Sequence, residues 1–150
     1  MVKQTSNEFH DRQRHAAKLM KRIMMQVRAL MDEKLRPYGV TTAQIQILLA
    51  IEKAPGSSGA QLSRQCQVTP QSAQALIQRA EEAGWIVRGK DSVNDRIVTA
   101  SLTPAGEELL KVADRLVKSI EVKLWHEISP ETIDSLIDVL EKCLLNITPE

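Results

Sequence analysis

The chain has 150 residues, of which 43% are hydrophobic and 26% charged, and its formal net charge is +1 at pH 7. These values are typical of a single soluble globular domain that is large enough to bury a core. The longest apolar run, residues 47–51, is too short to cross a bilayer, and the N-terminus lacks the apolar stretch of a secretory signal, so we expect a cytoplasmic protein without membrane contact.

Charge is distributed unevenly along the chain. Residues 1–36 hold nine Lys/Arg and four Asp/Glu, a balance of +5, whereas residues 37–103 have a balance of +1 and residues 104–150 one of −5. The acidic part is therefore separated in sequence from the central part. If the weakly basic central part binds phosphate, its affinity should be modest and sensitive to salt.

The first predicted element is a long amphipathic helix from about Asn7 to Arg36, which Pro37 ends. At about 1.5 Å per residue it would be on the order of 45 Å long, which exceeds what one small core needs. Its apolar stripe consists of Phe9, Ala16, Leu19, Met20, Ile23, Met24, Val27, Leu30, Met31 and Leu35. We therefore expect this helix to pack against a second subunit as well as its own domain; a surface helix of a monomer is the alternative.

Three shorter helices follow. Capping-box patterns at Thr41 and Ser58 begin the first two, with a loop over residues 54–59 between them. Thr69 followed by Pro70 begins the third, which a glycine at position 84 ends. The last two of these helices are joined by a tight turn, which is the spacing of a helix-turn-helix.

The two faces of the helix that begins after Thr69 differ in chemistry. The apolar positions on one face are Ala73, Leu76, Ile77, Ala80 and Ala83. The opposite face carries Gln71, Ser72, Gln74, Ala75, Gln78 and Arg79. These side chains are mostly short, uncharged or amide-bearing, which suits the reading of base edges in DNA.

A hairpin and two more helices complete the chain. Residues 85–88 and 97–102 are predicted strands, and the polar run 89–95 is the turn between them. Thr103 with Pro104 begins a helix to about Glu127, and Ser129 with Pro130 begins the last one. The expected fold is mainly α, a winged helix-turn-helix in the order α-α-α-α-β-β-α-α with long N- and C-terminal helices.

This pattern resembles the MarR family of bacterial transcription regulators. The matching segments are VTTAQIQIL (40–48), QLSRQCQVTPQSAQALIQRAEEAGWIVR (61–88) and ASLTPAGEEL (100–109). The resemblance implies a single compact domain with an N-terminal dimerisation helix (1–36), a winged helix-turn-helix DNA-binding lobe (37–103) and C-terminal dimerisation helices (104–150). It also implies an intertwined homodimer that binds double-stranded DNA at an imperfect palindrome, with no enzymatic activity.

The resemblance assigns DNA contacts to individual residues. Glutamine pairs with adenine and alanine offers a surface to the thymine methyl group, so we expect a half-site rich in A and T. Arg79 is expected to contact phosphate or, alternatively, to form a salt bridge with Glu82 or Asp95. The expected DNA-binding residues are Thr41, Ser58, Thr69, Gln71, Ser72, Gln74, Ala75, Gln78, Arg79, Arg88, Lys90, Asn94, Asp95 and Arg96.

The wing departs from the family pattern. Arg96 matches the arginine that enters the minor groove, but Asn94 stands where an acid usually steers it, and Asp95 stands where a basic residue is common. An amide oxygen holds a guanidinium more weakly than a carboxylate does. Asp91 or Asp95 is the alternative steering group. We expect a wing that contributes less electrostatic binding energy than is usual in the family.

The resemblance further implies a repressor that is released by a small aromatic or phenolic ligand. The candidate ligand-binding residues are Arg14, Met20, Arg22, Met24, Ile47 and Trp125. Two alternatives remain open: a redox-responsive regulator that uses Cys66, and a winged-helix module that binds protein rather than DNA. The histidines are scattered and no Cys-x-x-Cys is present, so no metal or cofactor is expected.

Overall fold

The structure, a computed structural model, describes residues 2–94 and 96–149. It is mainly helical, with one small antiparallel sheet of strand order β1-β3-β2. The elements are α1 (Val2–Leu35), η1 (Arg36–Tyr38), α2 (Thr42–Lys53), β1 (Ser57–Ser58), α3 (Gly59–Gln65), α4 (Pro70–Glu82), β2 (Ile86–Lys90), β3 (Val98–Leu102), α5 (Pro104–Leu124) and α6 (Pro130–Ile147). This order confirms the predicted winged helix-turn-helix.

Helices α2 to α6 each have a side-chain cap at the N-terminus. In each case a Ser or Thr hydroxyl accepts a hydrogen bond from the backbone N–H three residues later, which satisfies one of the unpaired amides of the first helical turn. The caps are Thr41, Ser58, Thr69, Thr103 and Ser129. Both predicted capping boxes are present, so these helix starts follow from local sequence.

Several elements differ from the sequence prediction, including β2, which continues to Lys90 into the segment predicted as the turn. The first helix begins at Val2 rather than near Asn7 and passes into the 3-10 turn η1 at its end. Helix α5 ends at Leu124 because the chain turns there, and Glu127 has a left-handed backbone with φ of 61°. The segment expected to be only a loop contains β1, in which Ser57 pairs with Ala100 of β3.

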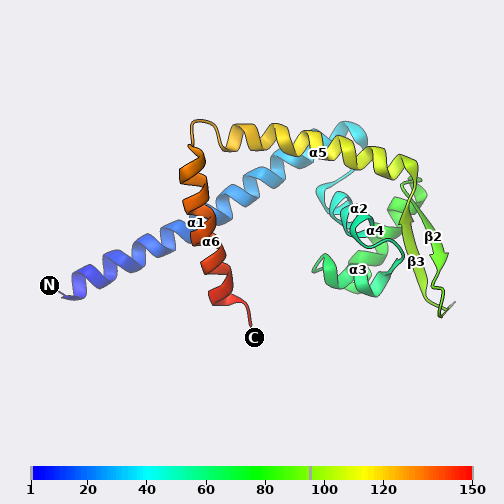
Figure 1. The fold of residues 1–150 in the computed structure, drawn as a ribbon, viewed down its shortest axis with the longest axis horizontal. Coiled ribbons are helices and arrows are strands. Elements are labelled where there is room, and N and C mark those ends of the chain that lie inside the picture. Colours follow the sequence, from blue (N-terminus) through cyan, green and yellow to red (C-terminus); the bar gives the residue numbers. More distant parts are fainter. Residues whose placement is uncertain (1, 95, 150) are drawn as a thin grey trace.

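The core lies in a lobe made by α2, α3, α4 and the sheet, and the C-terminal end of α1 and the N-terminal half of α5 close it (Figure 1). The largest fully buried side chains are Leu35, Ile47, Leu48, Ile51, Leu62 and Ile86. They come from α1, α2, α3 and β2, so the lobe has one continuous apolar centre that fixes the orientation of α4.

Helices α1, α5 and α6 extend away from this lobe (Figure 1). None of the residues of α6 is buried, and the large exposed apolar side chains of this helix are Leu136, Ile137, Val139, Leu140, Leu144, Leu145 and Ile147. Those of α1 are Phe9, Leu19, Met20, Ile23, Met24, Met25 and Leu30. The rest of the chain covers only part of these apolar stripes. Across the described helices, no segment has both the length and the apolarity that spanning a membrane requires.

Two turns of the chain, at residues 84–85 and at Thr103, are joined by hydrogen bonds where the sheet meets α5. Gly84 ends α4 with φ of 76°, and its carbonyl oxygen accepts a hydrogen bond from the Thr103 hydroxyl at 2.6 Å. The backbone N–H of Thr103 donates to the carbonyl oxygen of Trp85 at 3.0 Å, and the Thr103 hydroxyl also accepts from the N–H of Gly106 at 3.1 Å. One threonine therefore connects the end of α4 to the start of α5.

Gly106 leaves no space for a larger residue at this corner. A Cβ atom at this position would overlap the carbonyl oxygen of Trp85, which is backbone and already accepts from Thr103. We expect Gly106→Ala to destabilise the protein by about 3 kcal/mol or more, because the two turns must separate. Urea unfolding followed by circular dichroism measures this loss.

The matched control is Gly59→Ala in the first turn of α3. Its Cβ would meet only side-chain atoms at 3.7 Å or more, an ordinary contact distance. We expect this variant to stay within about 1 kcal/mol of the unsubstituted protein. Equal stability of the two variants would contradict the proposed role of the corner.

Candidate nucleic-acid interface

Helix α4 presents the face that the sequence predicts for base reading. Ala73, Ile77 and Ala80 are buried against the lobe, and the opposite side of the helix is open to solvent. The exposed positions are Gln71, Ser72, Gln74, Ala75, Gln78 and Arg79. These six side chains make the face polar, and Arg79 is the single formal charge among them. Its first turn is fixed by Thr69, which accepts from the Ser72 N–H at 3.1 Å and donates to the Ser72 hydroxyl at 2.9 Å.

The two other helix starts expected to meet phosphate already have partners in the protein. The backbone N–H of Ser58 donates to the Gln61 side chain at 2.8 Å. At the start of α2, Asp32 of α1 accepts from the backbone N–H of Thr42 at 2.8 Å and from its hydroxyl group, and these bonds hold the pKa of Asp32 below its usual range. A carboxylate at this position repels phosphate, so the structure does not favour Thr41 as a DNA contact. Sequence reasoning missed Asp32 because it lies ten residues before its partner.

The wing consists of β2, β3 and a tip between them. The Asp91 carboxylate accepts from the backbone N–H groups of Asn94 at 2.9 Å and Val93 at 2.8 Å, which lowers its pKa. Asn94 in turn accepts from the backbone N–H of Arg96 at 3.1 Å. Two of the three side chains considered for steering Arg96, Asp91 and Asn94, therefore hold the turn instead, and Arg96 is exposed. Asp95, the other expected contact, lies outside the described residues.

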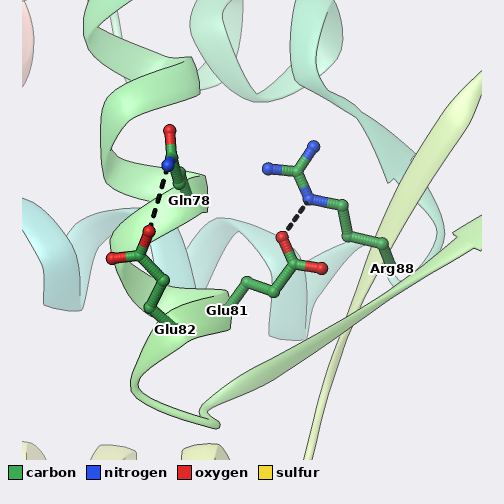
Figure 2. A network of polar contacts seen from close by, with 4 residues as sticks. All are labelled: Gln78, Glu81, Glu82 and Arg88. Atoms are coloured by element: carbon green, nitrogen blue, oxygen red, sulfur yellow. Dashed lines mark hydrogen bonds and ion pairs between the residues drawn. The ribbon is translucent and has the colours of Figure 1, made fainter.

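An ion pair connects the wing to α4. Arg88 Nε of β2 lies 2.7 Å from a carboxylate oxygen of Glu81, although the N–H is not aligned for a hydrogen bond (Figure 2). The Arg88 side chain is 26% exposed. Arg88 therefore joins two elements of the interface, while Lys90 at the end of β2 stays exposed.

A second polar contact lies within α4. The amide nitrogen of Gln78 donates to a carboxylate oxygen of Glu82 at 3.0 Å (Figure 2). Glu82 was one of the two partners expected for Arg79. Among residues 8–94 and 96–149, no carboxylate lies within ion-pair distance of Arg79, which leaves its guanidinium open to solvent on this face.

Cys66 lies at the end of α3 and is half-buried, with its thiol 3.8 Å from the carbonyl oxygen of Gln46. Burial raises the pKa of this thiol. Since the thiolate is the reactive form, the environment does not favour a redox role at neutral pH. Cys143 in α6 is exposed in the single chain.

A groove of about 350 Å³ lies between α1 and α5, outside the DNA-reading face. Its walls are mostly apolar, and its polar side chains are those of Arg22, Gln26 and Lys123. Of the expected ligand-binding residues, Arg22 lines this groove. Ile47 is fully buried in the core, whereas Met20, Met24 and Trp125 are exposed. Arg14 contacts His10 near the N-terminus.

Comparison with known proteins supports the same fold. A model of the MarR family matches residues 38–97. The HTH-type transcriptional repressor Rv2887 of Mycobacterium tuberculosis (strain ATCC 25618 / H37Rv) is 27% identical over 124 residues, which cover 83% of this chain and 89% of the relative.

Solved structures of MarR from E. coli are also similar to this chain. The wild-type apo form has a TM-score of 0.76 at 22% identity, covering 85% of this chain and 95% of that one. A cysteine-to-serine mutant of MarR, solved in complex with operator DNA, has a TM-score of 0.75 at 22% identity, covering 85% of this chain and 92% of that one. Two further similar structures are described as transcription regulators of the MarR family.

Proposed function

We propose that this chain, which belongs to the MarR family of transcription regulators, is a repressor that binds an imperfect palindrome in double-stranded DNA as a homodimer. The observation that carries the proposal is the polar, exposed face of α4 beside an antiparallel wing. A helix of this kind fits the major groove, where amide and hydroxyl groups distinguish base pairs. A module that binds protein would be expected to expose apolar groups on that face, which α4 does not.

The homodimer is inferred from the surfaces that the single chain leaves open. Helices α1 and α6 expose long apolar stripes, and no residue of α6 is buried. Their charges are also complementary, because residues 1–36 have a balance of +5 and residues 104–150 one of −5. A second copy would cover the stripes and pair the opposite charges. Two α4 helices held by such a dimer would meet half-sites about 10 bp apart.

Selection of bound sequences from random duplexes tests the proposal. At physiological salt we expect enrichment of a palindrome whose half-sites are rich in A and T, and light scattering should give twice the mass of the chain. No enriched motif would overturn the DNA-reading assignment. A monomer that still selects a palindrome would overturn the dimer.

The wing provides a second prediction. Arg96 is exposed at the tip, and we propose that it enters the minor groove and releases counterions there. Arg96→Ala should weaken binding to the selected DNA roughly tenfold and reduce the slope of log affinity against log salt by about 1. Lys111→Ala on α5 removes the same charge away from the tip and is the control. The wing assignment fails if the two variants change the slope equally.

We further propose that the groove between α1 and α5 binds a small aromatic acid that releases DNA. Its volume suits such a ligand, its walls are apolar, and Arg22 and Lys123 supply positive charge for a carboxylate. Because α1 and α5 both join the DNA-binding lobe, a ligand between them would change the position of the lobe.

Benzoate titration of the protein–DNA complex tests this effector site. We expect benzoate to release the selected DNA, and Arg22→Ala to require about tenfold more benzoate, since a charge-assisted contact is lost. Lys21→Ala, on a neighbouring position that does not line the groove, should respond like the unsubstituted protein. An unchanged response of Arg22→Ala would remove Arg22 from the site.

A further inference from the structure

The contact between Gln78 and Glu82 fixes the orientation of a side chain on the reading face. The two residues lie one turn apart on α4, and both are exposed. Gln78 Nε2 donates to Glu82 Oε1 at 3.0 Å. Figure 2 shows the amide nitrogen of Gln78 turned toward the carboxylate and its carbonyl oxygen turned away from it.

This orientation has a chemical cause. A glutamine amide can present either its donor or its acceptor to a ligand by rotating about its last bond. An ionised carboxylate only accepts hydrogen bonds, so the rotated amide would place one oxygen against another. Glu82 therefore selects the arrangement in which the carbonyl oxygen of Gln78 faces outward.

We propose that Glu82 is a positioning residue that holds Gln78 with its carbonyl oxygen outward, so that this position of α4 selects a base with an exocyclic amino group in the major groove. The inference rests on the proposed function, because it requires α4 to read DNA. The outward oxygen accepts from adenine N6 or cytosine N4, and it meets the keto oxygens of guanine O6 and thymine O4 unfavourably. The second N–H of the Gln78 amide stays available for adenine N7, which favours adenine over cytosine.

Glu82 also has a second effect that differs from positioning. Its negative charge lies on a face that approaches phosphates, so it weakens binding to every sequence. Removing the charge should raise affinity for all DNA alike, whereas removing the positioning contact should change preference at one base pair. The two effects are separable because one is independent of sequence and is screened by salt.

A double-mutant cycle on the selected operator tests the inference. The variants are Glu82→Ala, Gln78→Ala and both together, measured on operators that carry each of the four bases at the position contacted by residue 78. The operator position contacted by residue 78 is identified as the base pair at which Gln78→Ala abolishes the base preference. For the unsubstituted protein we expect adenine to be preferred over guanine and thymine by about three- to tenfold.

Glu82→Ala should reduce this preference to within about twofold, and it should have no further effect on preference when Gln78 is already alanine. It should raise affinity for all operators in both backgrounds. Glu82→Gln is the second variant: it retains the side-chain length, but its amide can donate or accept, so we expect the same loss of preference. Circular dichroism and thermal unfolding show whether the variants fold.

The outcomes separate this inference from the function on which it rests. If the unsubstituted protein selects no motif, both fail. If a motif is selected but Glu82→Ala or Glu82→Gln retains the full base preference, only the positioning role fails. A uniform rise in affinity with no change in preference leaves Glu82 as a surface charge and nothing more.

Discussion

The arrangement of this protein depends on the corner where Thr103 meets Gly84 and Trp85. Within a few ångströms, one hydroxyl and one backbone N–H connect the end of α4 and the start of β2 to the start of α5. Gly106 allows this approach because a side chain there would overlap a backbone oxygen. The end of α4 is therefore connected to the start of the long helix α5 through hydrogen bonds.

A second junction joins the lobe to α1. Asp32 lies near the end of α1 and caps the first turn of α2 through the backbone and hydroxyl groups of Thr42. The lobe is thus held at two points, by α1 through Asp32 and by α5 through Thr103. A change in the separation of α1 and α5 would therefore act on the lobe through the hydrogen bonds at both junctions. This geometry is why a ligand between those two helices is a reasonable means of control.

Features that depend on neighbouring residues could be predicted from the sequence, and features that depend on distant contacts could not. The caps at Thr41, Ser58 and Thr69 were predicted correctly because each is completed within four residues. Strand β1 was missed because two serines carry no strand pattern and pair only once β3 is beside them. The buried face of α4 followed from its 3.6-residue period, but the pairing of Arg88 with Glu81 required the position of β2 against the helix.

The same distinction applies to the wing. Alternation predicts its strands, but Asp91 and Asn94, two of the side chains considered for steering Arg96, hold the backbone of the tip. The reason is that Asp and Asn in a tight turn bond most readily to amides two or three residues later, and these are closer than the end of a long arginine. The sequence shows which residue types stand in a turn. Whether their side chains bond to the backbone or to another side chain depends on the path of the chain.

The charge of the segment 37–103, the proposed DNA-reading head, limits how tightly it can bind DNA. The segment 37–103 has a charge balance of only +1, Glu81 and Glu82 lie at the end of α4, and Arg88 is paired within the protein. A single head of this kind has little general attraction to phosphate, so in the proposed complex discrimination would come from oriented polar groups such as Gln78. In the proposed homodimer, linking two heads would make the second contact intramolecular and would multiply weak binding. That gain exists only when the spacing of the two heads matches the DNA, so the proposed binding depends on the helices that set this spacing.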